Sequence, residues 1–67
     1  MIKAVINGKE AEVKKDSTLA DVITLYKLNP ERVVAEINGN VLTRDKYADT
    51  LVNNGDKVEL INFVGGG

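Results

Sequence analysis

The sequence predicts an α+β fold in which a mixed sheet of four to five strands packs on one helix. Three observations predict it. Two alternating apolar and polar runs flank Asn7-Gly8, a stretch of helical periodicity follows near residues 18–28, and short β-rich runs separated by turns fill the rest of the chain. The 67 residues are the size of one small domain.

The chain opens with a hairpin. Residues 2–6 and 9–14 both alternate between apolar and polar side chains, which is the period of a half-buried strand. Asn7-Gly8 lies between them, and this dipeptide suits a two-residue turn because both of its positions need positive φ. We therefore expect two antiparallel strands with their apolar members facing the core.

A helix is expected next. Thr18 suits its N-cap and Asp21, three residues later, completes a capping box, with Ser17 as the alternative cap. The buried face is expected to comprise four residues at helical spacing: Leu19, Val22, Ile23 and Tyr26. The helix should end near Leu28 or Asn29, because Pro30 disfavours helical dihedral angles in the residue before it.

The second half of the chain is expected to supply the remaining strands and turns. They are a strand over 33–37, an Asn-Gly turn at 38–39, a return strand beginning at 41–42, an irregular stretch with a single helical turn over 43–49, a short edge strand at 51–52, a turn at 54–56 and a final strand from 57 to about 64.

These elements indicate how the domain is assembled. A single amphipathic helix must bury its apolar stripe against one face of the sheet. The outer strands are joined by a helical crossover, so they should lie parallel. The arrangement that satisfies both conditions is the β-grasp, or ubiquitin-like, fold. We expect residues 1–64 to form this domain and residues 65–67 to form a flexible C-terminal glycine tail.

Composition excludes several functions. The chain has no Cys and no His, so disulfides, zinc–thiolate sites and Cys or His catalysis are ruled out, and we expect neither catalytic residues nor a metal site. A net charge of −1 without a basic stripe argues against a nucleic-acid partner. Charges spread through residues 1–20, and the lack of a long apolar segment, predict no signal peptide, no membrane insertion and a cytoplasmic location.

The final glycines carry the most distinctive chemistry. Gly65, Gly66 and Gly67 follow an apolar run, and the α-carboxylate of Gly67 is a reactive group on an arm without side chains. Because glycine has no Cβ, such an arm can enter a channel too narrow for other residues. The alternative is an ordinary frayed end.

Ile61, Phe63 and Val64 lie just before these glycines and are predicted to form a docking surface for a partner. This prediction depends on strand alternation, which turns Ile61 and Phe63 away from the helix if Val58 and Leu60 face it. The alternative is that Phe63 packs at the rim of the core.

Four segments resemble the ThiS sulfur carriers of thiamine biosynthesis, within the ThiS/MoaD group of ubiquitin-like proteins. They are Ile6-Asn7-Gly8-Lys9, Ile37-Asn38-Gly39, Leu42-Thr43-Arg44-Asp45-Lys46-Tyr47 and the stretch from Asn54 to Gly67. The resemblance covers essentially the whole chain. It departs from the family in its third glycine, in the lack of a proline near Thr43, and in Tyr47 where other members have tryptophan.

The resemblance implies a carrier that is not itself an enzyme. A ThiF-type adenylating enzyme would use ATP to activate the carboxylate of Gly67, while Gly65 and Gly66 thread into its active site. Sulfur from a donor such as a cysteine desulfurase would convert the adenylate to a thiocarboxylate. Thiazole synthase (ThiG) would then accept the sulfur. ATP belongs to the partner, so the carrier needs no cofactor of its own.

Three other functions stay open at this point. One is a related carrier for another acceptor, in molybdopterin or amino-acid biosynthesis. Another is a ubiquitin-type modifier, which would form isopeptide-linked conjugates. The last is a β-grasp binding module without covalent chemistry, for which deletion of Gly66 and Gly67 would change nothing.

Overall fold

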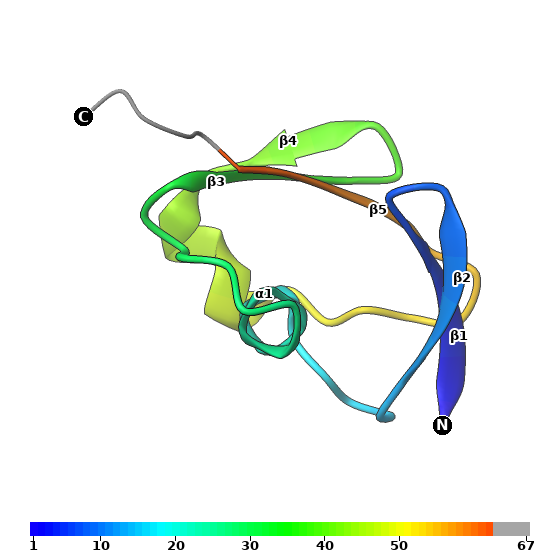
Figure 1. Ribbon diagram of the computed structural model, residues 1–67. Coiled ribbons are helices and arrows are strands. Elements are labelled where there is room, and N and C mark those ends of the chain that lie inside the picture. The colour runs from blue at the N-terminus through cyan, green and yellow to red at the C-terminus, as the bar shows by residue number, and fades with distance from the viewer. Residues whose placement is uncertain (63–67) are drawn as a thin grey trace.

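A computed structural model describes residues 1–62 as one mixed sheet with a single α-helix beneath it (Figure 1). The elements in chain order are β1 (Ile2–Ile6), β2 (Lys9–Val13), α1 (Leu19–Leu25), β3 (Val33–Ile37), β4 (Asn40–Leu42), the 3₁₀ helix η1 (Arg44–Asp49) and β5 (Lys57–Asn62). The five strands are ordered β2-β1-β5-β3-β4. The predicted α+β class is confirmed.

Two hairpins form the flanks of the sheet, and β5 joins them. β1 pairs antiparallel with β2 and β3 pairs antiparallel with β4, whereas β5 runs parallel to β1 and antiparallel to β3. β2 and β3, which α1 connects, therefore run in the same direction on either side of the β1–β5 pair. The hairpin turns behave as their sequences predict, with positive φ at Asn7 (52°) and Asn38 (52°).

The core lies between α1 and one face of the sheet. The helix contributes Leu19, Val22 and Ile23, all of which are fully buried. Each such side chain stabilises the fold by about 1.5–3 kcal/mol through loss of contact with water. The sheet contributes alternate residues of β1, β3 and β5: Ala4, Ile6, Val33, Ala35, Val58 and Leu60.

The start of α1 matches its prediction. The Asp21 backbone N–H donates to Thr18 Oγ1 at 3.1 Å, and the Thr18 N–H donates to Asp21 Oδ2 at 2.9 Å, which completes the capping box. Ser17 is therefore not the cap.

The end of α1 differs from its prediction. The helix ends at Leu25, well before Leu28 or Asn29, because Lys27 adopts a left-handed conformation with φ of 59°. The Leu28 N–H donates to the Ile23 carbonyl at 3.0 Å and the Lys27 N–H to the Thr24 carbonyl at 2.9 Å. This pair of bonds is a Schellman motif, which terminates the helix before Pro30 can act.

The prediction that Tyr26 belongs to the buried face was wrong. Since α1 ends early, Tyr26 is its C-cap residue and lies 39% exposed. The tyrosine of the core is Tyr47 on η1, which is 4% exposed and donates its hydroxyl to the Val33 carbonyl at 3.0 Å.

Two predictions for strands near the end of the chain have different outcomes. No edge strand forms at 51–52. Leu51 makes a single bridge with Thr18, and the Val52 N–H donates to the Ser17 carbonyl at 2.9 Å, so this segment pairs with the approach to α1. β5 begins at Lys57 as predicted and is described as far as Asn62, while its predicted continuation to Val64 lies outside the described residues.

No helix within residues 1–62 has the length and apolar composition to cross a bilayer.

Candidate functional site

The candidate site begins at the end of β5, the strand that leads into the final glycines. β5 is a central strand, paired with β3 from Ile37↔Val58 to Val33↔Asn62 and with β1 near its start. Val58 and Leu60 are buried toward the helix, whereas Glu59 and Ile61 face away from it. The predicted outward orientation of Ile61 is confirmed. Phe63, Val64, Gly65, Gly66 and Gly67 lie outside the described residues.

Side chains form hydrogen bonds with β5 and with its neighbour β3 at the points where the adjoining strands end. β1 ends at Ile6, and beyond it Asn7 Oδ1 accepts the Leu60 N–H at 2.8 Å, so a side chain continues the ladder. On the other side of β3, pairing with β4 reaches only Ala35↔Leu42, and Tyr47 satisfies the carbonyl of Val33. These bonds hold the end of β5 against a rigid body.

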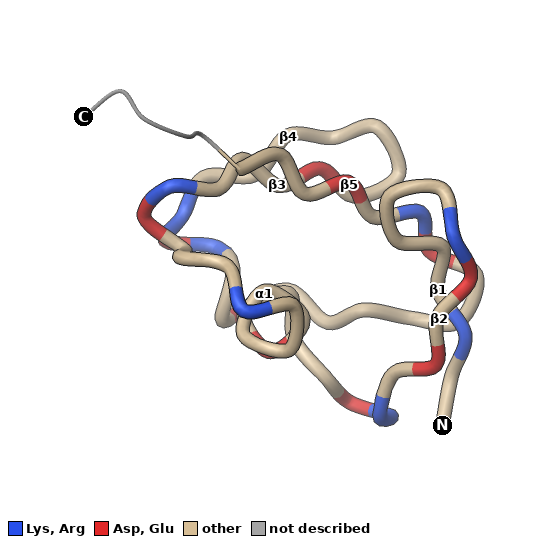
Figure 2. The backbone as a smooth tube through the Cα atoms, in the orientation of Figure 1, with Lys and Arg blue, Asp and Glu red and all other residues tan. Residues whose placement is uncertain are grey.

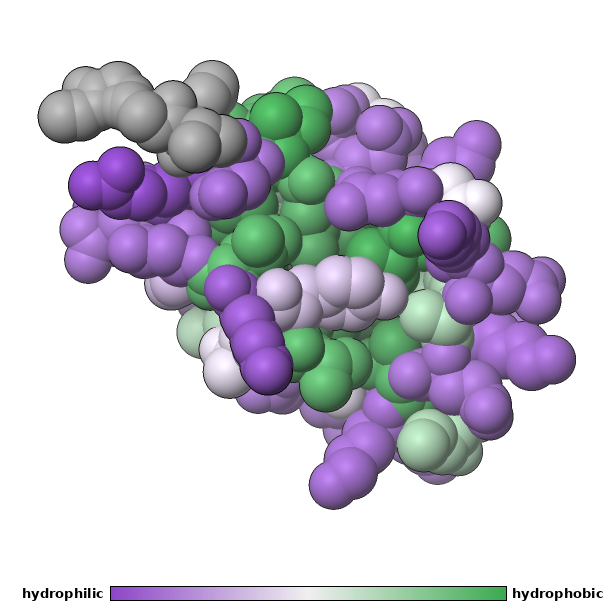
Figure 3. All heavy atoms as spheres, in the orientation of Figure 1, coloured by the Kyte–Doolittle hydropathy of each residue, from purple (hydrophilic) through white to green (hydrophobic). Residues whose placement is uncertain are grey.

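An exposed apolar surface surrounds Ile61 on the face of the sheet away from α1. Val34 lies directly opposite Ile61, and Val41 lies opposite Glu36, one step diagonally from Val34. Ile61 is 48% exposed, Val41 is 64% exposed and Val34 is half-buried. We call these three residues the apolar patch. Figure 3 shows hydrophobic residues, in green, exposed at the top of the molecule over β4 and beside the grey residues.

Sequence reasoning found Ile61 but missed Val34 and Val41. A signal existed for both. Val34 is an apolar residue at an outward position of β3, where the next outward residue is the charged Glu36. Val41 is an apolar residue directly after the polar Asn40 in the short strand β4. Neither signal identifies a common surface without the pairing of β3 with β5 and β4.

Two carboxylates adjoin the apolar patch. Glu36 and Glu59 lie directly opposite each other on β3 and β5, on the same outward face. Figure 2 shows acidic segments at the adjoining positions of these two strands. We call Glu36 and Glu59 the acidic pair.

An open hollow of about 500 Å³ borders the patch on the side of η1. It is lined by residues that include Val34, Val41 and Arg44. Arg44 forms an exposed ion pair with Glu31, with 3.6 Å between Nη1 and Oε1. The Thr43 hydroxyl donates to the Asp45 carboxylate and lowers the pKa of that carboxyl. Arg44 and Asp45, at the start of η1, are exposed.

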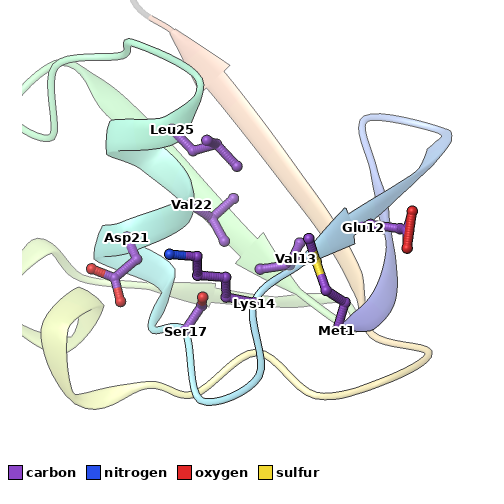
Figure 4. A pocket seen from close by; sticks show the side chains of 8 residues that line it. All are labelled: Met1, Glu12, Val13, Lys14, Ser17, Asp21, Val22 and Leu25. Carbon is purple, nitrogen blue, oxygen red and sulfur yellow. The ribbon is translucent and has the colours of Figure 1, made fainter.

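A second hollow lies between α1 and β2 and is also about 500 Å³ (Figure 4). Val13, Val22 and Leu25 are apolar residues of its lining, and Lys14 and Asp21 are charged ones. None of its lining residues belongs to β5, so it is separate from the candidate site. Within residues 1–62 no group of His, Cys, Asp or Glu side chains is arranged to hold a metal ion.

Comparisons with known proteins show which family the chain belongs to. The chain matches the model of the ThiS family over residues 4–67. It is 33% identical over 63 residues to the sulfur carrier protein ThiS of Bacillus subtilis, covering 92% of this chain and 96% of that protein.

Two further comparisons concern a longer relative and a solved structure. A thiazole synthase of Paramagnetospirillum magneticum is 33% identical over 66 residues, which cover 98% of this chain but only 20% of that enzyme. The crystal structure of the thiamine biosynthesis protein ThiS from Geobacter metallireducens superimposes with a TM-score of 0.83 at 33% identity, covering 98% of this chain and all of the other. The chain therefore belongs to the ThiS family.

Proposed function

We propose that this protein is a sulfur carrier of thiamine biosynthesis and that the α-carboxylate of Gly67 is its reacting group. One observation carries the proposal. The match to the ThiS family runs through to Gly67, and in that family the relative named as a sulfur carrier matches this chain over nearly its whole length. The ordered body then serves to present the last residues to other proteins.

The chemistry requires an activated acyl group. In the proposed reaction a carboxylate oxygen of Gly67 attacks the α-phosphorus of ATP, pyrophosphate leaves, and an acyl-adenylate forms. A persulfide on a donor such as a cysteine desulfurase attacks the carbonyl carbon, and AMP leaves as an acyl disulfide forms. A thiol then attacks the donor-side sulfur of this acyl disulfide, which breaks the S–S bond, forms a disulfide with the donor and releases the thiocarboxylate. The adenylate must be shielded from water, so this reaction belongs inside a closed site of the ThiF-type partner.

The proposed role of the three glycines follows from sterics and entropy. Gly65 and Gly66 can pass through a narrow channel because they carry no Cβ. Fixing each residue of the arm costs about 1–2 kcal/mol, so the body must supply compensating contacts when it docks. We assign those contacts to Ile61, Phe63 and Val64, of which Ile61 is exposed on the described surface.

Thiazole synthase is the proposed acceptor of the sulfur. A stretch similar to nearly all of this chain makes up about a fifth of the thiazole synthase from Paramagnetospirillum magneticum. Joining two domains in one polypeptide raises their effective concentration, which suits partners that must exchange a group. Because the activating partner consumes ATP, the proposed location is the cytoplasm.

Intact-mass analysis tests the proposal. We expect incubation with a ThiF-type adenylating enzyme, ATP and a sulfide source to raise the mass by the difference between one sulfur and one oxygen. A chain lacking Gly66 and Gly67 should show no change under the same conditions. An unchanged mass for the intact chain, with an enzyme that converts an authentic ThiS protein in parallel, would refute the proposed function.

A further inference from the structure

The outward face of the sheet is divided into two regions of different chemistry. Toward β2, Lys3 lies directly opposite Glu12 and Glu10 lies opposite the apolar Val5, so no two carboxylates face each other across the strands. Toward the end of β5 it carries the apolar patch and, beside it, the acidic pair. The second region combines exposed hydrophobic surface with two carboxylates that lie directly opposite each other on adjacent strands.

The acidic pair is an unfavourable arrangement for the isolated domain. Like charges directly opposite on adjacent strands repel and destabilise a sheet. The other cross-strand neighbours of the pair carry no positive charge. On β4 the residue opposite Glu36 is Val41, and on the β1 side the residue that binds β5 beside Glu59 is Asn7. Lys57 is two residues from Glu59 on the same face, but within residues 1–62 neither carboxylate forms an ion pair. The fold itself gives no reason for two carboxylates here.

We propose that the apolar patch is the docking surface for the adenylating partner and that a Lys or Arg side chain of that partner inserts between Glu36 and Glu59. This inference rests on the proposed function and identifies what kind of surface the partner presents there. Apolar contact would form the centre of the interface, and the charge pair would set its orientation.

The reach of the arm supports this occupant. Five residues separate Asn62, the last residue of β5, from Gly67, and a fully extended chain spans at most about 3.3–3.6 Å per residue. The mouth of the partner's active site must therefore lie against the surface around the end of β5 when Gly67 is adenylated. Ile61 and Val34 of the apolar patch lie at this end of β5, one step from the Val33–Asn62 pair.

The charge of the occupant follows from its substrate. An enzyme that binds the triphosphate of ATP needs cationic groups in and around its active site to stabilise the phosphates. A carboxylate pair on the carrier complements such a mouth. In the complex the inserted cation relieves the repulsion between Glu36 and Glu59, so the arrangement that is unfavourable in the free carrier favours association.

Binding kinetics of matched charge variants test the inference. The double variant E36Q/E59Q removes the acidic pair, and E10Q/E12Q removes the same charge from the same face on β2. With a purified ThiF-type adenylating enzyme at low salt, we expect E36Q/E59Q to associate about three- to tenfold more slowly than the wild type and with a weaker salt dependence. E10Q/E12Q should associate at close to the wild-type rate.

Thermal unfolding supplies a second readout. Because the substitution removes a repulsion, E36Q/E59Q should melt at the wild-type temperature or higher while binding more weakly. Equal association rates for the two double variants, or faster association of E36Q/E59Q, would overturn the inference. The wild-type protein separates this failure from that of the proposed function. If the wild type gains sulfur at Gly67 and the variants associate at equal rates, only the docking inference is wrong.

Discussion

Tyr47 shows how one side chain completes the sheet where a strand is too short. β4 has three residues, and its pairing with β3 stops at Ala35. The carbonyl of Val33 would then face the core edge without a strand partner, which is costly for a buried backbone group. The Tyr47 hydroxyl donates to it from η1, so this end of β3, which also pairs with the last residue of β5, is held in place.

Removal of that hydroxyl tests its contribution. We expect Tyr47→Phe to lower the free energy of unfolding by about 1 kcal/mol, since a buried carbonyl loses its partner while the ring still fills the core. Urea denaturation measures the change. Tyr26→Phe is the matched control, because Tyr26 is exposed and its loss of a hydroxyl should leave stability unchanged. Equal effects of the two substitutions would contradict this role of Tyr47.

Asparagine has a double role at the turns. Asn7 and Asn38 each adopt positive φ, as a two-residue hairpin turn requires. Each also accepts a backbone N–H of β5 through its side-chain oxygen, Asn7 from Leu60 at 2.8 Å and Asn38 from Lys57 at 2.9 Å. The same residue type therefore forms the turn and ties it to the central strand.

At the level of elements, the stability of α1 comes from the hydrogen bonds at its two ends and from the burial of one face. Seven residues are too few for a helix to be stable alone in water. The capping box at Thr18 and the Schellman motif at Lys27 satisfy its terminal backbone groups, and three of its residues are fully buried. Lys27 is the weak point, because a residue with a Cβ pays a steric penalty at positive φ.

Lys27→Gly should strengthen the helix terminus. Glycine adopts this conformation without steric cost, and after allowance for its greater freedom when unfolded we expect a gain of about 0.5–1 kcal/mol in the free energy of unfolding. Ala20→Gly is the control within the helix, where the same residue type should cost about 1 kcal/mol. Chemical denaturation of both variants gives the comparison. A loss of stability in Lys27→Gly would show that its φ is not the limiting feature.

At the level of the whole molecule, the described core and the proposed chemistry occupy different parts of the chain. Every buried hydrophobic residue among residues 1–62 falls between Ala4 and Leu60. The proposed reacting group is at Gly67. The body can therefore be stable without the residues that would react, which suits a protein whose last residues must enter another protein's active site.

Deletion of Gly66 and Gly67 should separate folding from function. The melting temperature is expected to stay at the wild-type value, because the buried core among residues 1–62 is built from residues between Ala4 and Leu60. Thiocarboxylate formation should be lost completely. Calorimetry and intact-mass analysis of the same sample give the two readouts, and retained sulfur transfer by the shortened chain would rule out Gly67 as the reacting group.

Local chemistry in the sequence determined most of the elements. The hairpin at Asn7-Gly8, the capping box at Thr18 and the strand over 33–37 depend on near neighbours, so turn propensity and periodicity predict them correctly. The outward orientation of Ile61 follows from alternation within one strand. The family resemblance also identified the glycines as the proposed reactive end.

The tertiary structure alone decided which distant residues meet. It placed β5 between β1 and β3, buried Tyr47 in place of Tyr26, and used the segment at 51–52 to pair with the approach to α1. The apolar patch and the acidic pair also arise only there. Their members are separated by many residues in sequence, and the register between strands, which local propensity does not encode, brings them to one face.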